Sequence, residues 1–324
     1  MIPDTAGLHA SRRTMLGIAC GMGAGALWGL VFLAPALAHD FSPIQLTIGR
    51  YVFYGLFSAA IMAPRWRRTV AQATRSDWLA LGWLGLCGNI LYYILLSGAV
   101  QLGGIAMTSL VIGFLPVAVT LVGSRDHGAV PLVRLWPSLL LSVAGVLCIG
   151  WQAVAAPAAG SAGRQLIGLA CAGGALLSWV VFAVGNSRAL NRLDHIGAHD
   201  WNLLMGIVTG SLSLLLIPWS LAFDGEPHAM LDWARLAGVS MGVALLASIL
   251  GNLLWNRMSR LLPLTLVGQM ILFETLFALL YGFLWEARLP TGLEAAAFVL
   301  VVASVLSCIA AHRGPTAPEA VQPA

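Results

Sequence analysis

Apolar side chains dominate this sequence in long runs that short polar connections separate. Each run is close to the 20 residues that an α-helix needs to cross a membrane's hydrocarbon core. The pattern predicts an all-α polytopic membrane protein with ten transmembrane helices. The ten runs cover residues 15–37, 43–63, 78–99, 104–122, 135–154, 165–186, 200–222, 234–256, 262–284 and 292–311.

The composition supports the membrane assignment. Hydrophobic residues make up 59% of the 324 residues and charged residues 9%, whereas a soluble domain carries about 25% charged residues. So few charges cannot cover a soluble surface, so the lipid bilayer must be the main solvent of the chain. The net charge of +4 is explained by arginines in cytoplasmic loops, and no nucleic-acid partner is expected.

The arginines predict the orientation in the membrane. With the N-terminus placed inside and the helices alternating, 13 arginines fall in inside segments and 3 outside, and Arg50 lies within a helix. This bias follows the positive-inside rule. We therefore expect an inner-membrane protein with a cytoplasmic N-terminus (1–14) and a disordered cytoplasmic tail (312–324). The outside arginines are Arg164, Arg235 and Arg288, and the inside ones are Arg12, Arg13, Arg65, Arg67, Arg68, Arg75, Arg125, Arg134, Arg188, Arg192, Arg257, Arg260 and Arg313.

The N-terminal segment allows a second interpretation. Residues 11–16 resemble a twin-arginine export signal, and Ala36-Leu37-Ala38 offers an A-x-A cleavage site. Such signals usually precede a folded soluble domain, and here more membrane follows. The run from Met15 to Leu37 is also long enough to span, so we favour a first transmembrane helix.

Two short motifs occur twice and indicate an internal repeat. Residues 88–92, Gly-Asn-Ile-Leu-Tyr, match residues 251–255, Gly-Asn-Leu-Leu-Trp, and residues 25–28 resemble residues 174–179. The copies fall in the third and eighth helices and in the first and sixth. Each half would contain five helices, and an odd number of crossings ends on the other side of the membrane. The second half would therefore enter the membrane from the opposite side to the first. We expect two inverted five-helix repeats, 15–154 and 165–311, with the substrate site between them near the midplane.

Several motifs occur in a recognisable order between residues 15 and 311: Trp28-Gly29 with Phe32, Arg50, Pro116 and the run from Phe273 to Glu286. Together they resemble the EamA-type members of the drug/metabolite transporter superfamily. The chain departs from the family pattern at Ser124-Arg125-Asp126-His127, where a Gly-Glu pair is usual, and at Thr275 and Trp285. The resemblance implies ten helices around a central cavity, and export or exchange of small metabolites, amino acids or drugs.

Two ionisable residues, Arg50 and Glu274, lie well inside apolar runs. A charge at the centre of a membrane helix costs about 2.5–3.5 kcal/mol on insertion scales, so such residues are usually functional or paired. Glu274 is a candidate proton or cationic-substrate site, or else a structural carboxylate between helices. Arg50 is a candidate substrate group, or else a packing residue that bonds carbonyls or reaches outward.

Uncharged polar and aromatic residues supply the other candidates. Asn252, Trp255 and Asn256 follow helical i, i+3, i+4 spacing, and Asn89 and Tyr92 place a similar face on the third helix. Such faces turn away from lipid, either to line a cavity or to join helices. The remaining candidates are Trp28, Trp179 and Gln269; Gln269 lies five residues before Glu274, so both cannot face one cavity squarely.

The sequence gives little support to enzyme chemistry. The apolar runs contain no cluster of metal-ligating residues, no G-x-S-x-G and no Walker motif, so we expect no cofactor and no metal. The five cysteines lie in apolar runs without a C-x-x-C pair. We expect a secondary transporter that exports or exchanges small amino-acid-like or amphipathic metabolites, with protons as a candidate coupling ion and a homodimer left open. A non-transporting sensor or scaffold with the same fold is the alternative.

Overall fold

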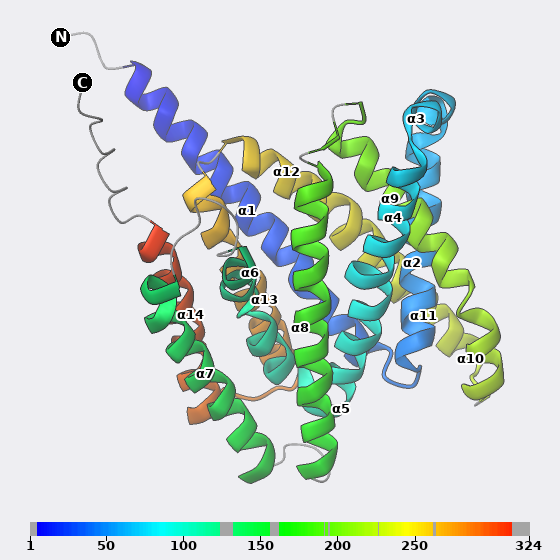
Figure 1. Cartoon of the computed structure of the whole chain (residues 1–324). Helices are drawn as coiled ribbons and strands as arrows, with labels where there is room; N and C mark the ends of the chain where they lie inside the picture. Colours follow the sequence, from blue (N-terminus) through cyan, green and yellow to red (C-terminus); the bar gives the residue numbers. More distant parts are fainter. Residues whose placement is uncertain are drawn as a thin grey trace.

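The protein is a bundle of helices (Figure 1). The computed structural model describes residues 5–123, 132–155, 162–190, 192–193, 195–225, 227–261 and 264–312, and these residues form helices without any strand. The expected all-α architecture is therefore confirmed. The predicted tail from 313 onward, the loop from Ser124 to His127 and the side chain of Gln269 lie outside the described part.

The helices of the first half cover the predicted apolar runs, but the helix Tyr92–Ile112 continues across the expected boundary between the runs 78–99 and 104–122. The first one begins ten residues before its run, at Thr5. The elements are α1 (Thr5–Leu37), α2 (Pro43–Met62), η1 (Ala63–Arg65), α3 (Trp66–Gln72), α4 (Arg75–Gly85), η2 (Leu86–Leu91), α5 (Tyr92–Ile112), α6 (Leu115–Gly123) and α7 (Leu132–Ala155).

The helices of the second half also coincide with the predicted runs. They are α8 (Ala162–Leu190), α9 (Ala198–Leu214), α10 (Ile217–Phe223), α11 (Met230–Val243), η3 (Ala244–Gly251), α12 (Asn252–Leu261), α13 (Leu264–Trp285) and α14 (Gly292–His312).

Within the described residues, seven helical segments are long and apolar enough to cross a membrane. Two shorter apolar helices, Phe273–Trp285 and Gly292–Cys308, accompany them. One of the seven, Arg75–Ile112, is 38 residues long and is interrupted at Gly104, whose φ of 86° and ψ of 166° are not helical. A residue with a side chain rarely adopts such a φ, so the glycine permits the break.

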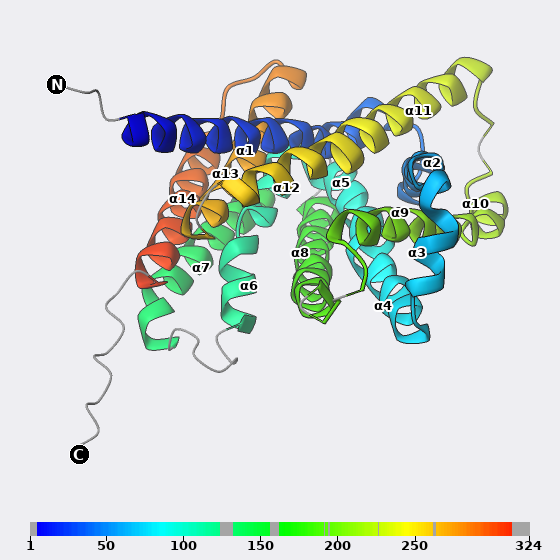
Figure 2. The same ribbon diagram turned by 90° about the horizontal axis from the view of Figure 1, so that it is seen from above.

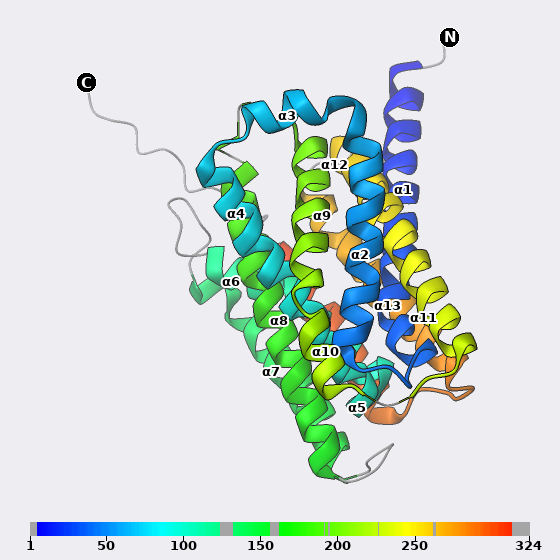
Figure 3. The same ribbon diagram turned by 90° about the vertical axis from the view of Figure 1, so that its right-hand side faces the viewer.

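Local sequence explains where α2 begins. Ser42 and Gln45 form a capping box: the backbone N–H of Gln45 donates to Ser42 Oγ (3.1 Å), and the backbone N–H of Ser42 donates to Gln45 Oε1 (2.9 Å). Pro43 occupies the first helical position, where its missing N–H costs no hydrogen bond. Figure 3 shows α2 lying between α9 and α11.

Small residues set the closest helix pairings. A Cβ atom on Gly25 of α1 would lie 2.7 Å from the Cβ of Phe273 of α13, so only glycine permits this approach. Gly55 of α2 faces Gly210 of α9 in the same way. Close contact through small residues is the usual means of association in membranes, because apolar side chains gain little over lipid. Figure 2 shows α1 running beside α12.

Candidate functional site

A cavity of about 480 Å³ lies between helices of the first and the second half of the chain. Nine of the ten candidate residues line it; the tenth is Gln269. The polar and aromatic residues of its wall are Trp28, Arg50, Tyr51, Tyr54, Asn89, Tyr92, Trp179, Phe182, Asn186, Ser187, Trp201, Asn202, Ser248, Asn252, Trp255, Asn256 and Glu274.

Two π-helical turns carry part of the wall. The first, η2 (Leu86–Leu91), bears Asn89. A π turn widens the helix and weakens its regular hydrogen bonding, and such turns are frequent at functional sites. Here side chains from other helices bond its carbonyls: Ser178 Oγ donates to Cys87 O (2.7 Å), and the Tyr51 hydroxyl donates to Asn89 O (3.1 Å).

The second π turn, η3 (Ala244–Gly251), lies directly before Asn252. Trp28 Nε1 donates to the carbonyl of Ala247 (3.1 Å), and Asn252 Nδ2 donates to that of Ser248 (2.9 Å). The indole of Trp28 also packs against Trp255, with ring centroids 5.0 Å apart. These bonds fix the wall where the first half meets the second.

A group of polar residues that the sequence analysis did not select connects the halves. The Tyr54 hydroxyl donates to Asn202 O (3.1 Å), and Asn252 Nδ2 lies 3.4 Å from Asn202 Oδ1. Trp201 Nε1 donates to Asn186 Oδ1 (2.9 Å). The sequence signal for these residues was the placement of Asn186 and Asn202 at the ends of the apolar runs 165–186 and 200–222. The spacing did not show that their side chains point toward the cavity.

Arg50 projects from α2 into the cavity wall, and its side chain is 8% exposed. Its guanidinium carbon lies 4.4 Å from the ring centre of Tyr93 and 5.2 Å from that of Tyr51. Nη2 lies 3.4 Å from Ser248 Oγ, a long hydrogen bond, and Nε and Nη1 have no hydrogen-bond partner among the described residues.

Glu274 comes from α13, which Gly25 brings close to α1. Its half-buried side chain lines the cavity. No ion pair or hydrogen bond joins it to another side chain in the described part of the protein. The charge of Arg50 acts on the carboxylate, but the two groups are not within the 4.0 Å of an ion pair.

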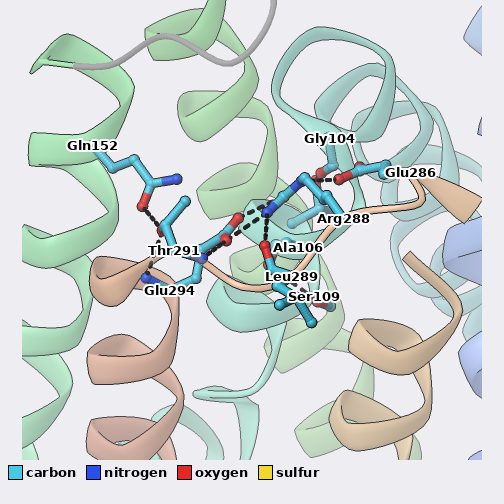
Figure 4. A network of polar contacts seen from close by, with 10 residues as sticks. Gly104, Ala106, Ser109, Gln152, Glu286, Arg288, Leu289, Thr291 and Glu294 are labelled. Atoms are coloured by element: carbon cyan, nitrogen blue, oxygen red, sulfur yellow. Dashed lines mark hydrogen bonds and ion pairs between the residues drawn. The ribbon is translucent and has the colours of Figure 1, made fainter. Parts of the chain in front are cut away.

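A second cavity, of about 360 Å³, lies beside the connection between α13 and α14. Figure 4 shows its polar network. Arg288 donates from Nη1 and Nη2 to the two carboxylate oxygens of Glu294 (2.7 Å each) and from Nε to Glu286 (2.6 Å). These hydrogen bonds raise the pKa of Arg288 above its usual value. This arginine is fully neutralised by the protein. Across the described residues, no group of three or more His, Cys, Asp and Glu side chains is placed to hold a metal ion.

Comparison with known proteins agrees with the helical cavity. Residues 15–151 match the EamA-like transporter family. The chain carries an EamA-family domain. The resemblance inferred from Trp28, Arg50 and Pro116 is thereby confirmed.

Two further similarities cover nearly the whole chain. The chain is 29% identical over 313 residues to the inner membrane protein YtfF of Escherichia coli strain K12, and the aligned region covers 91% of this chain and 95% of that relative. A solved crystal structure with 21% sequence identity has a TM-score of 0.59 and covers 92% of this chain and 98% of the other. That similarity shows the fold alone. The relative is an inner membrane protein, in agreement with the apolar helices found here.

Proposed function

We propose that this EamA protein is a secondary transporter that exports or exchanges small amino-acid-like or amphipathic metabolites across the inner membrane. The observation that carries the proposal is the cavity of about 480 Å³, which residues from both halves line. Arg50 and Glu274 both face it without neutralising each other. A cavity shared by two halves can open alternately to either side when the halves rock against each other.

The proposed architecture is ten crossings in two inverted repeats, 15–154 and 165–311. The helix pairings support it, because they repeat when the halves are exchanged. The first helix, α1, packs against α12 and α13, and α8 packs against α5 and α6. In the pairs α2–α9 and α7–α14, each helix packs against its own counterpart in the other half. The two π turns at 86–91 and 244–251 also hold matching places in the halves.

Polar links at the ends of the bundle follow the same exchange. At one end, His195 Nε2 lies 2.9 Å from a carboxylate oxygen of Asp77, which stands in the first turn of α4. At the same end, Arg65 Nη2 lies 3.2 Å from a carboxylate oxygen of Asp200 in the first turn of α9. At the other end, Arg235 of α11 forms the matching ion pair with Asp40. There Ser42 Oγ also donates a hydrogen bond to the carboxylate of Asp224 (2.7 Å). Such links could hold either end closed and break in turn during transport.

Coupling and orientation complete the proposal. Glu274 is the proposed proton site, since it is an acidic side chain of the cavity wall with no bonding partner in the described chain. Both termini are proposed to be cytoplasmic, which the arginine distribution supports. A scaffold would need no cavity between the halves, so the cavity favours transport over that alternative.

The test compares small metabolites in cells that overexpress the protein with those in cells that lack it. A plugged variant, Ala183→Trp, places a large ring in the cavity wall. The matched control, Leu177→Trp on the same helix, changes a side chain that is 66% exposed on the outer surface of the bundle. We expect solutes to be depleted inside cells that contain wild type or the control and not in those with the plugged variant. Equal metabolite levels in all strains would reject the transporter assignment.

A further inference from the structure

Arg50 is a buried cation for which the described part of the protein supplies no anion. The side chain is 8% exposed, and among the described residues no carboxylate lies within 4.0 Å of it. Two of its three nitrogens, Nε and Nη1, have no acceptor within the part of the chain that the structure describes. Removing a charge from water is costly unless it is paired and hydrogen-bonded. An arginine left in this condition beside a cavity points to an acceptor that arrives from outside.

Among the described residues, the neighbours of Arg50 stabilise its charge mainly through the faces of two tyrosine rings. The guanidinium lies over Tyr93 at 4.4 Å and near Tyr51 at 5.2 Å, and a cation–π contact stabilises a cation through the face of the ring. The N–H groups point along the guanidinium plane and need acceptors in that plane. Ser248 Oγ, at 3.4 Å from Nη2, accepts one long hydrogen bond there, and Nε and Nη1 stay without an acceptor among the described residues.

Arg288 shows how the same chain neutralises an arginine for a structural purpose. It is more exposed than Arg50, with a side-chain exposure of 32%, yet Glu286 and Glu294 accept from all three of its nitrogens. The more deeply buried Arg50 has none of these partners. This contrast argues against a purely structural role for Arg50.

We infer that Arg50 binds the carboxylate of the solute in the cavity, so that the transported compounds are small organic acids or zwitterions and not simple amines. The inference rests on the proposed transport function and names the substrate class of the same cavity. A carboxylate matches a guanidinium because it accepts two N–H groups in one plane. The aromatic wall formed by Trp28, Trp179 and Trp255 suits the apolar part of such a solute.

The test is ligand binding to the purified full chain in lipid nanodiscs, read by quenching of the tryptophan fluorescence. Four probes of similar size separate the chemical classes: butyrate, 2-aminobutyrate, butyramide and butylammonium. Inorganic phosphate is a fifth probe, since a phosphate oxyanion also binds arginine. We expect butyrate and 2-aminobutyrate to bind roughly tenfold or more tightly than the amide and the amine, which corresponds to about 1.4 kcal/mol or more.

Variants assign the binding to Arg50. Arg50→Gln should weaken butyrate binding roughly tenfold or more, and Arg50→Lys should retain part of it, because the charge stays while the planar fork is lost. Arg67→Gln removes the same charge from an exposed position and should bind butyrate like wild type. Thermal unfolding of each variant checks the fold, and Arg50→Lys replaces Arg50→Gln if the latter does not fold.

Four results would overturn the inference. They are tighter binding of butylammonium than of butyrate, binding of phosphate without butyrate, no quenching by any probe, and butyrate binding unchanged in both Arg50 variants. The metabolite comparison with Ala183→Trp does not depend on Arg50. If it shows export while the carboxylate series fails, the substrate class is wrong and the transport function stands.

Discussion

Trp28 of α1 donates its indole N–H to the carbonyl oxygen of Ala247, 219 residues further along the chain, at 3.1 Å. This bond joins the first helix to the π turn before Asn252. It depends on Gly251, because a Cβ at that position would lie 2.7 Å from Trp28 Nε1. A bulky aromatic side chain from one half is thus held against the backbone of the other at the cavity wall.

Gly251→Ala should therefore displace Trp28. Overpacking of this kind costs about 1–3 kcal/mol, and we expect a lower unfolding temperature and weaker transport. Gly238→Ala is the control, since a Cβ at Gly238 would meet nothing within 4 Å and alanine favours a helix. Thermal unfolding of the purified variants measures both effects. Equal stability of Gly251→Ala and Gly238→Ala would show that the Trp28 contact is not tight.

Arg50→Gln should keep or raise the stability of the ligand-free protein, although it weakens carboxylate binding. The buried charge is desolvated without an anionic partner among the described residues, and its removal relieves that desolvation cost. Loss of the contacts with Tyr93 and Tyr51 offsets part of this, at about 0.5–2 kcal/mol. We expect an unchanged or higher unfolding temperature without butyrate, and loss of the increase that butyrate gives wild type. A clearly lower unfolding temperature would indicate a structural arginine.

Glu274→Gln should keep the protein folded and inserted, because glutamine has nearly the same shape and no charge. If Glu274 carries the coupled proton, the variant should transport at a rate that does not respond to an imposed pH gradient. Flux of a carboxylate substrate into proteoliposomes, with and without the gradient, measures this. A variant that follows wild type across the pH range would exclude Glu274 as the coupling site.

The expected orientation in the membrane predicts which engineered cysteines a thiol reagent can reach from outside the cell. In a background from which the five cysteines have been removed, a cysteine at Met230, which is 85% exposed, should react in intact cells with a thiol reagent that cannot cross the membrane. A cysteine at Arg68, on α3, should react only after the cells are opened. The expectation follows from the arginine distribution. The reverse labelling would place both termini outside.

The sequence alone was sufficient for the class of the protein and for most of the cavity wall. Long apolar runs with few charges can be solvated only by lipid, so the membrane helices were predictable. The EamA resemblance was recognisable from motifs such as Trp28-Gly29 and Pro116. Arg50 and Glu274 were recognisable because a charge in hydrocarbon is costly. Asn252, Trp255 and Asn256 were recognisable because their spacing places them on one helical face.

Only the tertiary structure decided how these residues meet. It brought Tyr54, Asn186 and Asn202 into the wall, widened the helices at 86–91 and 244–251, and broke α5 at Gly104. Among the described residues it gave Arg50 no carboxylate partner, whereas Arg288 received two. The physical reason is that lipid is as apolar as a helix interface. Hydrophobic patterning therefore marks a helix in the membrane but does not distinguish the face that packs against another helix from the face that contacts lipid. That choice depends on close fits such as Gly25 against Phe273, which exist only once all the helices are assembled.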